Sequence, residues 1–108
     1  MIIIDLTQKI INKVFAFYAQ ATGLDNSSLP GLDQVKPALE SETRRFVFQS
    51  PKSKALPVEL WFSEDSNRNI VFTFAIPADL TKAETEKAEE AKKFFDKQLQ
   101  AYLVDYYI

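Results

Sequence analysis

The centre of the chain alternates between apolar and other side chains with a period of two, and this pattern constrains the fold more than any other feature. It recurs in three segments, RRFVFQ (44–49), LPVELWFS (56–63) and NIVFTFAI (69–76). Such alternation, carried by aromatic and β-branched residues, is typical of strands with one buried face. The connections SPKSKA and EDSNRN are short and rich in turn-forming residues. We therefore expect a three-stranded antiparallel meander.

The alternation also predicts what each face of this sheet carries. The face expected to be buried has Phe46, Phe48, Leu56, Val58, Leu60, Phe62, Ile70, Phe72, Phe74 and Ile76. The opposite face has Val47, Trp61, Val71, Thr73 and Ala75, with Arg45 and Glu59 beside them. This second face is more apolar than a solvated face needs to be. It is either an ordinary mixed surface or a docking surface anchored by Trp61, since tryptophan is enriched at interface hot spots.

A helix is expected before the strands, from about Asp5 to Ala21. Its apolar residues recur at spacings of three and four, which places them on one helical face: Leu6, Ile10, Val14, Phe17, Tyr18 and Ala21. Asp5 can cap the start, and Gly23 can adopt the left-handed turn just past the end. The β-branched run from Ile2 to Ile4 favours a short strand ahead of the helix.

Residues 24–42 form the one segment without a clear period, and we expect it to be an irregular loop. Pro30 and Gly31 predict a turn. Leu32, Val35 and Leu39 have helical spacing, but a proline at position 37 is expected to break that short helix.

A long helix is expected after the strands, because Thr81 and Glu84 form a capping box that satisfies two orphan backbone donors. The helix should run to about Tyr106, with an apolar stripe of Ala88, Ala91, Phe95, Leu99, Tyr102 and Tyr106. The chain is thus predicted to be a single α+β domain over residues 1–108. Both helices should pack on the sheet face lined by Phe48, Leu60 and Phe72.

The composition excludes several kinds of site. The 108 residues include no histidine and no cysteine. The commonest general base, the commonest metal ligand and any disulfide are therefore absent. We expect no enzymatic activity, no cofactor and no metal. The first residues lack the basic region of a secretory leader, and no apolar run is long enough to span a membrane, so we expect a cytoplasmic protein without membrane contact.

The C-terminal segment FFDKQLQAYLVDYYI (94–108) is apolar on more than one side of its predicted helix. A helix that is apolar nearly all round is usually buried all round, and one sheet covers only one side. This apolar surface could be buried in three ways. The 24–42 segment could fold over it, the tail could become an added strand, or a second copy or another protein could pack on it. The last option predicts a protein interface with contacts at Trp61, Phe94, Tyr102, Val104, Tyr106 and Tyr107.

A basic stretch gives an alternative function. Arg44, Arg45, Lys52 and Lys54 occur with no acidic residue among them, whereas the whole chain has a net charge of −2. They could contact phosphates of a nucleic acid, although the overall acidity argues against a nucleic-acid partner. Lysines at a strand edge also discourage aggregation without having any ligand.

The order helix, three strands, helix is similar to that of the double-stranded-RNA-binding domain, as are the segments YAQATGL and TKAETEKAEEAKK. That family grips phosphates with lysines at the start of its last helix. Here glutamates interrupt those lysines, the first loop is too long, and the family's histidine is missing. The resemblance therefore stops at the order of elements.

These observations predict a small non-enzymatic protein-interaction module, homodimeric, that acts as an adaptor, inhibitor, immunity factor or chaperone. The alternative is a nucleic-acid-binding regulator that uses the basic hairpin 44–54.

Overall fold

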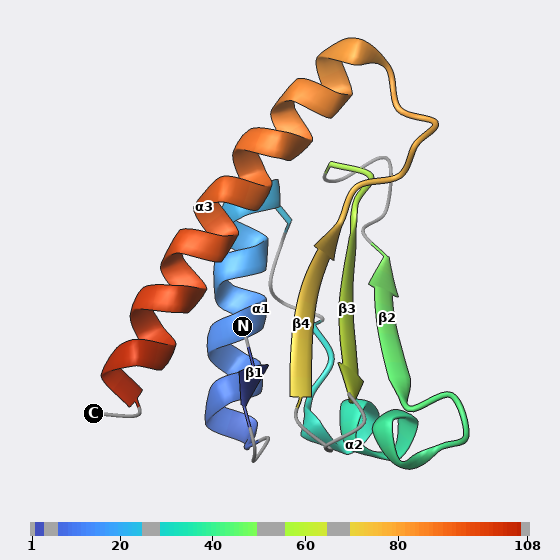
Figure 1. Ribbon diagram of the computed structural model, residues 1–108, viewed down its shortest axis with the longest axis vertical. Helices are drawn as coiled ribbons and strands as arrows, with labels where there is room; N and C mark the ends of the chain where they lie inside the picture. Colours follow the sequence, from blue (N-terminus) through green and yellow to red (C-terminus); the bar gives the residue numbers. More distant parts are fainter. Residues whose placement is uncertain (1, 4–6, 25–28, 50–55, 65–69, 107–108) are drawn as a thin grey trace.

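The computed structural model describes residues 2–3, 7–24, 29–49, 56–64 and 70–106, with residues 2–3 and 104–106 described by their backbone. The elements, in chain order, are β1 (Ile2–Ile3), α1 (Gln8–Thr22), α2 (Leu32–Glu40), β2 (Arg45–Gln49), β3 (Glu59–Glu64), β4 (Ile70–Ala75) and α3 (Lys82–Tyr106). Figure 1 shows α1 and α3 beside the sheet, with α2 across one end of it. The α+β arrangement expected from the sequence is confirmed.

The sheet is the predicted antiparallel meander with one strand added. Its order is β1-β4-β3-β2, and every neighbouring pair is antiparallel. The register places Phe46 beside Phe62 and Phe62 beside Phe72. The predicted strand of isoleucines exists as β1, which pairs with the first two residues of β4.

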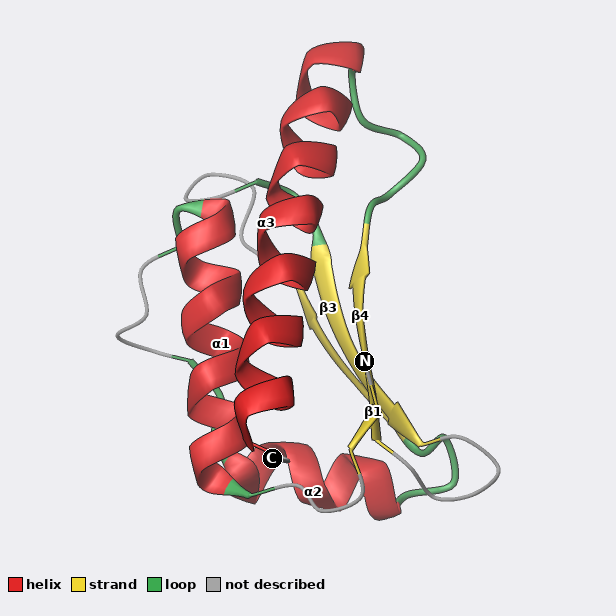
Figure 2. Ribbon diagram, turned by 60° about the vertical axis from the view of Figure 1, so that its left-hand side comes forward, coloured by secondary structure: helices red, strands yellow, loops and turns green. Residues whose placement is uncertain are grey.

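All the helices lie on the same side of the sheet or at its end (Figure 2). This is the predicted face, because Phe15 of α1 packs edge-on against Phe48 and stacks on Phe62, at centroid distances of 5.4 Å in both cases. Phe95 of α3 contacts Phe74 of β4 at 5.6 Å. Aromatic rings from both helices and the strands therefore form one continuous core.

The start of α1 differs from the prediction. The cap is Thr7, whose hydroxyl accepts a hydrogen bond from the backbone N–H of Ile10 at 3.3 Å, and helix geometry begins at Gln8. The predicted cap, Asp5, lies outside the described residues. A threonine immediately before the first helical residue is a preferred N-cap, and it shortens the helix relative to the prediction. Gly23 ends the helix with a φ of 77°, as expected.

The predicted break at Pro37 is wrong, because α2 continues through it. Pro37 has no backbone N–H, so the carbonyl of Asp33 loses its helical hydrogen bond. Asp33 is exposed, so a water molecule can donate to that carbonyl instead. Burial of Val35 and Leu39 stabilises the helix. The start of α2 is held by Gln8, whose side-chain carbonyl accepts the N–H of Leu32 at 2.9 Å.

The long last helix is confirmed together with its capping box. The Thr81 N–H donates to Glu84 Oε1 at 3.1 Å, and the Glu84 N–H donates to Thr81 Oγ1 at 3.2 Å. Its buried residues are Ala88, Ala91, Phe95, Leu99 and Leu103. In the part of the chain that the structure describes, no helix is long and apolar enough to cross a membrane.

A buried hydroxyl joins α1 to the sheet. Tyr18 has no exposed surface, and its OH donates to the carbonyl of Val58, just before β3, at 3.0 Å. We expect Tyr18→Phe to lower the free energy of unfolding by about 1–3 kcal/mol, because that carbonyl stays buried without its donor.

Urea unfolding checks this prediction. The slope of free energy against urea should stay the same, because the ring and its packing remain. A loss below about 0.5 kcal/mol would show that the hydrogen bond is unimportant to stability.

Candidate protein-interaction surface

The outer face of the sheet is a regular grid of side chains. The strand register gives three rows across β2, β3 and β4. They are Arg45–Ser63–Val71, Val47–Trp61–Thr73 and Gln49–Glu59–Ala75. Trp61 is therefore the centre of the grid, flanked by Val47 and Thr73. We call these nine residues the outer face.

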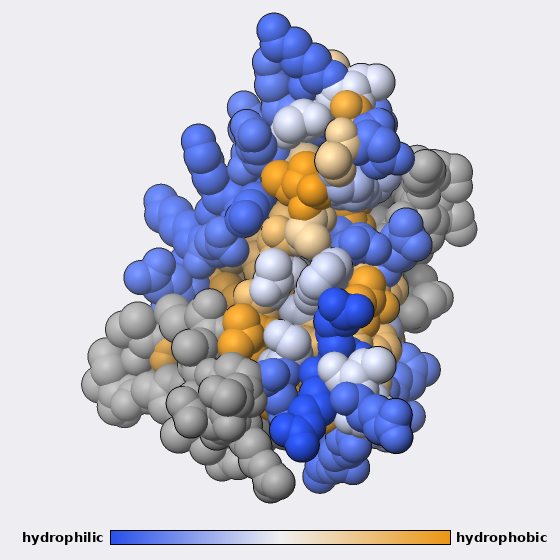
Figure 3. Space-filling view, turned by 45° about the vertical axis from the view of Figure 1, so that its right-hand side comes forward, coloured by the Kyte–Doolittle hydropathy of each residue, from blue (hydrophilic) through white to orange (hydrophobic). Residues whose placement is uncertain are grey.

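No described helix covers the outer face, since α1 and α3 both lie behind the sheet (Figure 2). Figure 3 shows apolar and weakly polar side chains over the strands, with strongly hydrophilic side chains both beside them and among them. Val47 keeps 39% of its surface exposed, and Trp61 is half-buried. Val47 therefore leaves apolar surface of this face in contact with water.

Two charged side chains hold the indole of Trp61. The Arg45 guanidinium carbon lies 4.8 Å from the ring centroid, within the range of a cation–π interaction. The Trp61 Nε1–H donates to Glu59 Oε1 at 3.3 Å. Because residues two apart on a strand share a face, Glu59 lies beside Trp61, and Arg45 reaches it diagonally from β2. These contacts hold the ring in one orientation.

The end of α3 is covered in a way that the sequence did not predict. Tyr102 packs edge-on against Phe17 of α1 at 6.0 Å, and Lys13 Nζ lies 5.9 Å from its ring centroid. Leu103 is buried with 1% exposure. The cover on this side is therefore α1. The backbone stays helical to Tyr106, so the tail does not become a strand over 101–106.

Of the interface residues predicted at the chain end, Phe94 is 40% exposed and remains accessible. Tyr102 is half-buried against α1. The side chains of Val104 and Tyr106, and all of Tyr107, lie outside the described residues. A contact role for these residues stays a prediction.

The basic residues do not gather into one site among those the structure describes. Arg45 lies on Trp61. Arg44, in a left-handed backbone conformation with a φ of 49°, lines a hollow with Leu39, Glu40 and Glu64. The two acidic neighbours oppose the positive potential that a phosphate would need. Lys52 and Lys54 lie outside the described residues, so the nucleic-acid contact stays a prediction.

Among the described residues, no three metal-ligating side chains come together. The sequence placed Arg45, Glu59 and Trp61 on one face, but it did not predict that both charged groups would engage the indole. The available signal was that Glu59 and Trp61 are two residues apart on one strand, and that Arg45 lies on the same face of the neighbouring strand.

No protein-family model matches the chain, and no curated protein or solved structure shows significant similarity to it.

Proposed function

We propose that this chain is a non-enzymatic protein-interaction module that forms a homodimer through its outer face. The observation that carries the proposal is the Trp61 indole, held between Arg45 and Glu59 at the centre of a sheet face that no described helix covers. Tryptophan and arginine are enriched among the residues that dominate binding energy.

The charges of the outer face favour a second copy as the occupant. In a two-fold dimer, the same patch meets itself, so it must be self-complementary. A two-fold axis across the strands at the Trp61 row brings the Arg45 row of one copy over the Glu59 row of the other. Viewed along the normal to the sheets, Arg45 is then displaced sideways from the other copy's Glu59 by about one strand spacing, ~4.8 Å. Each dimer would gain two such pairs around the stacked centres.

This dimer would act as an adaptor, inhibitor, immunity factor or chaperone-like subunit, in the cytoplasm. The absence of histidine and cysteine supports a role in binding rather than in catalysis. Nucleic-acid binding is less well supported, because Arg45 is engaged by Trp61 and Arg44 adjoins two carboxylates.

The test uses single charge reversals whose effects depend on the partner copy. Arg45→Glu makes the outer face acidic, and Glu59→Arg makes it basic. Each variant alone should dimerise on the order of 100-fold more weakly than the wild type, because like charges then meet twice. An equimolar mixture should form a heterodimer, because an acidic face meets a basic one.

Analytical ultracentrifugation of the wild type, both variants and the mixture measures these states. Glu90→Lys, on the exposed surface of α3, is the matched control and should leave the mass unchanged. Circular dichroism confirms that each variant is folded. A monomeric wild type, or two variants that dimerise as the wild type does, would refute the homodimer.

A further inference from the structure

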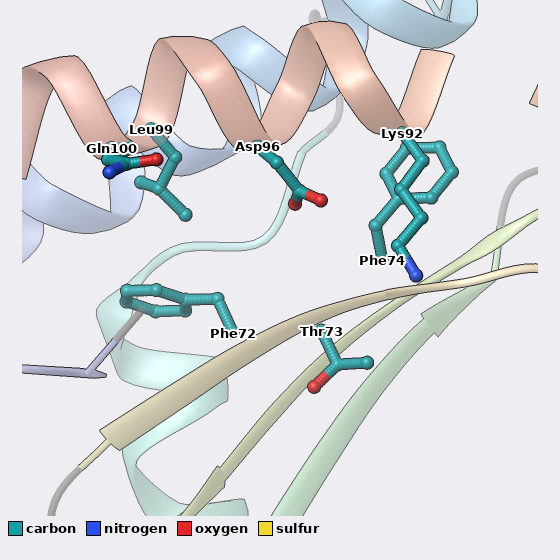
Figure 4. Close-up of a pocket in the computed structure, with 7 residues that line it drawn as sticks. All are labelled: Phe72, Thr73, Phe74, Lys92, Asp96, Leu99 and Gln100. Atoms are coloured by element: carbon teal, nitrogen blue, oxygen red, sulfur yellow. The ribbon is translucent and has the colours of Figure 1, made fainter. Parts of the chain in front are cut away.

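We draw no further inference here: the strongest candidate, the groove between α3 and β4 that is lined by Phe72, Phe74, Lys92 and Asp96 (Figure 4), carries none, because nothing in the described part of the chain shows what covers that edge of β4.

Discussion

Phe62→Ala is expected to lower the free energy of unfolding by about 3–5 kcal/mol, the cost of removing a large aromatic side chain from a core that cannot close around the space. Phe62 is fully buried at the centre of the inner sheet face. Its ring contacts Phe15 of α1, Phe46 of β2 and Phe72 of β4, with centroids at 5.4, 6.1 and 5.1 Å. The substitution therefore weakens the helix layer and both neighbouring strands together.

A domain of this size has a total stability of about 5–15 kcal/mol, so the loss is a large fraction of it. Guanidinium unfolding followed by circular dichroism measures the change, at one fixed protein concentration, because the apparent stability of a dimer depends on concentration. Phe46→Ala is the matched control: it removes the same atoms from the same face, but Phe46 is half-buried on an edge strand. It should cost clearly less. Equal losses would show that burial does not set the cost at these positions.

Phe95→Ala is expected to cost a similar amount, about 3–5 kcal/mol, for a different structural reason. Phe95 anchors α3, because its fully buried ring packs on Phe74 of β4 and on Tyr18 of α1, at 5.6 and 6.3 Å. Removing the ring takes away a contact of the last helix with each of these two elements.

The adjacent residue supplies the control for this prediction. Phe94 is 40% exposed, and Phe94→Ala should change stability by no more than about 0.5 kcal/mol, as most exposed substitutions do. Thermal unfolding monitored by circular dichroism compares the two variants. If Phe94→Ala proves as costly as Phe95→Ala, the assignment of the buried side of α3 is wrong.

Much of the fold was predictable because its signals are periodic and local. Alternation across 44–76 predicts both the strands and their inner face, since a shift of one residue would turn every phenylalanine toward water. The capping box at Thr81 predicts the start of α3, because both partners lie within one turn. Such features need no knowledge of distant residues.

The errors arose where a distant contact outweighed a local preference. Pro37 is a helix breaker by itself, yet α2 persists because Val35 and Leu39 reach the core and Gln8 of another helix holds its first turn. Likewise, the sequence could not show that α1 covers Tyr102, since this depends on how two helices far apart in the sequence lie together.

The candidate surface was predictable in part, because strand alternation is a local pattern in the sequence. Strand alternation placed Arg45, Glu59 and Trp61 on one face, but the ring contact at 4.8 Å depends on the register between β2 and β3.

The pairing of β1 with β4 has a consequence for how the molecule assembles. The hairpins of the meander pair strands that are neighbours in the sequence. The pairing of Ile2 with Val71 instead closes a loop that contains most of the chain. Closing that loop costs entropy that the hairpins do not pay, so contacts of this kind form slowly. We therefore expect the three-stranded meander to form first and the first strand to pair with it afterwards.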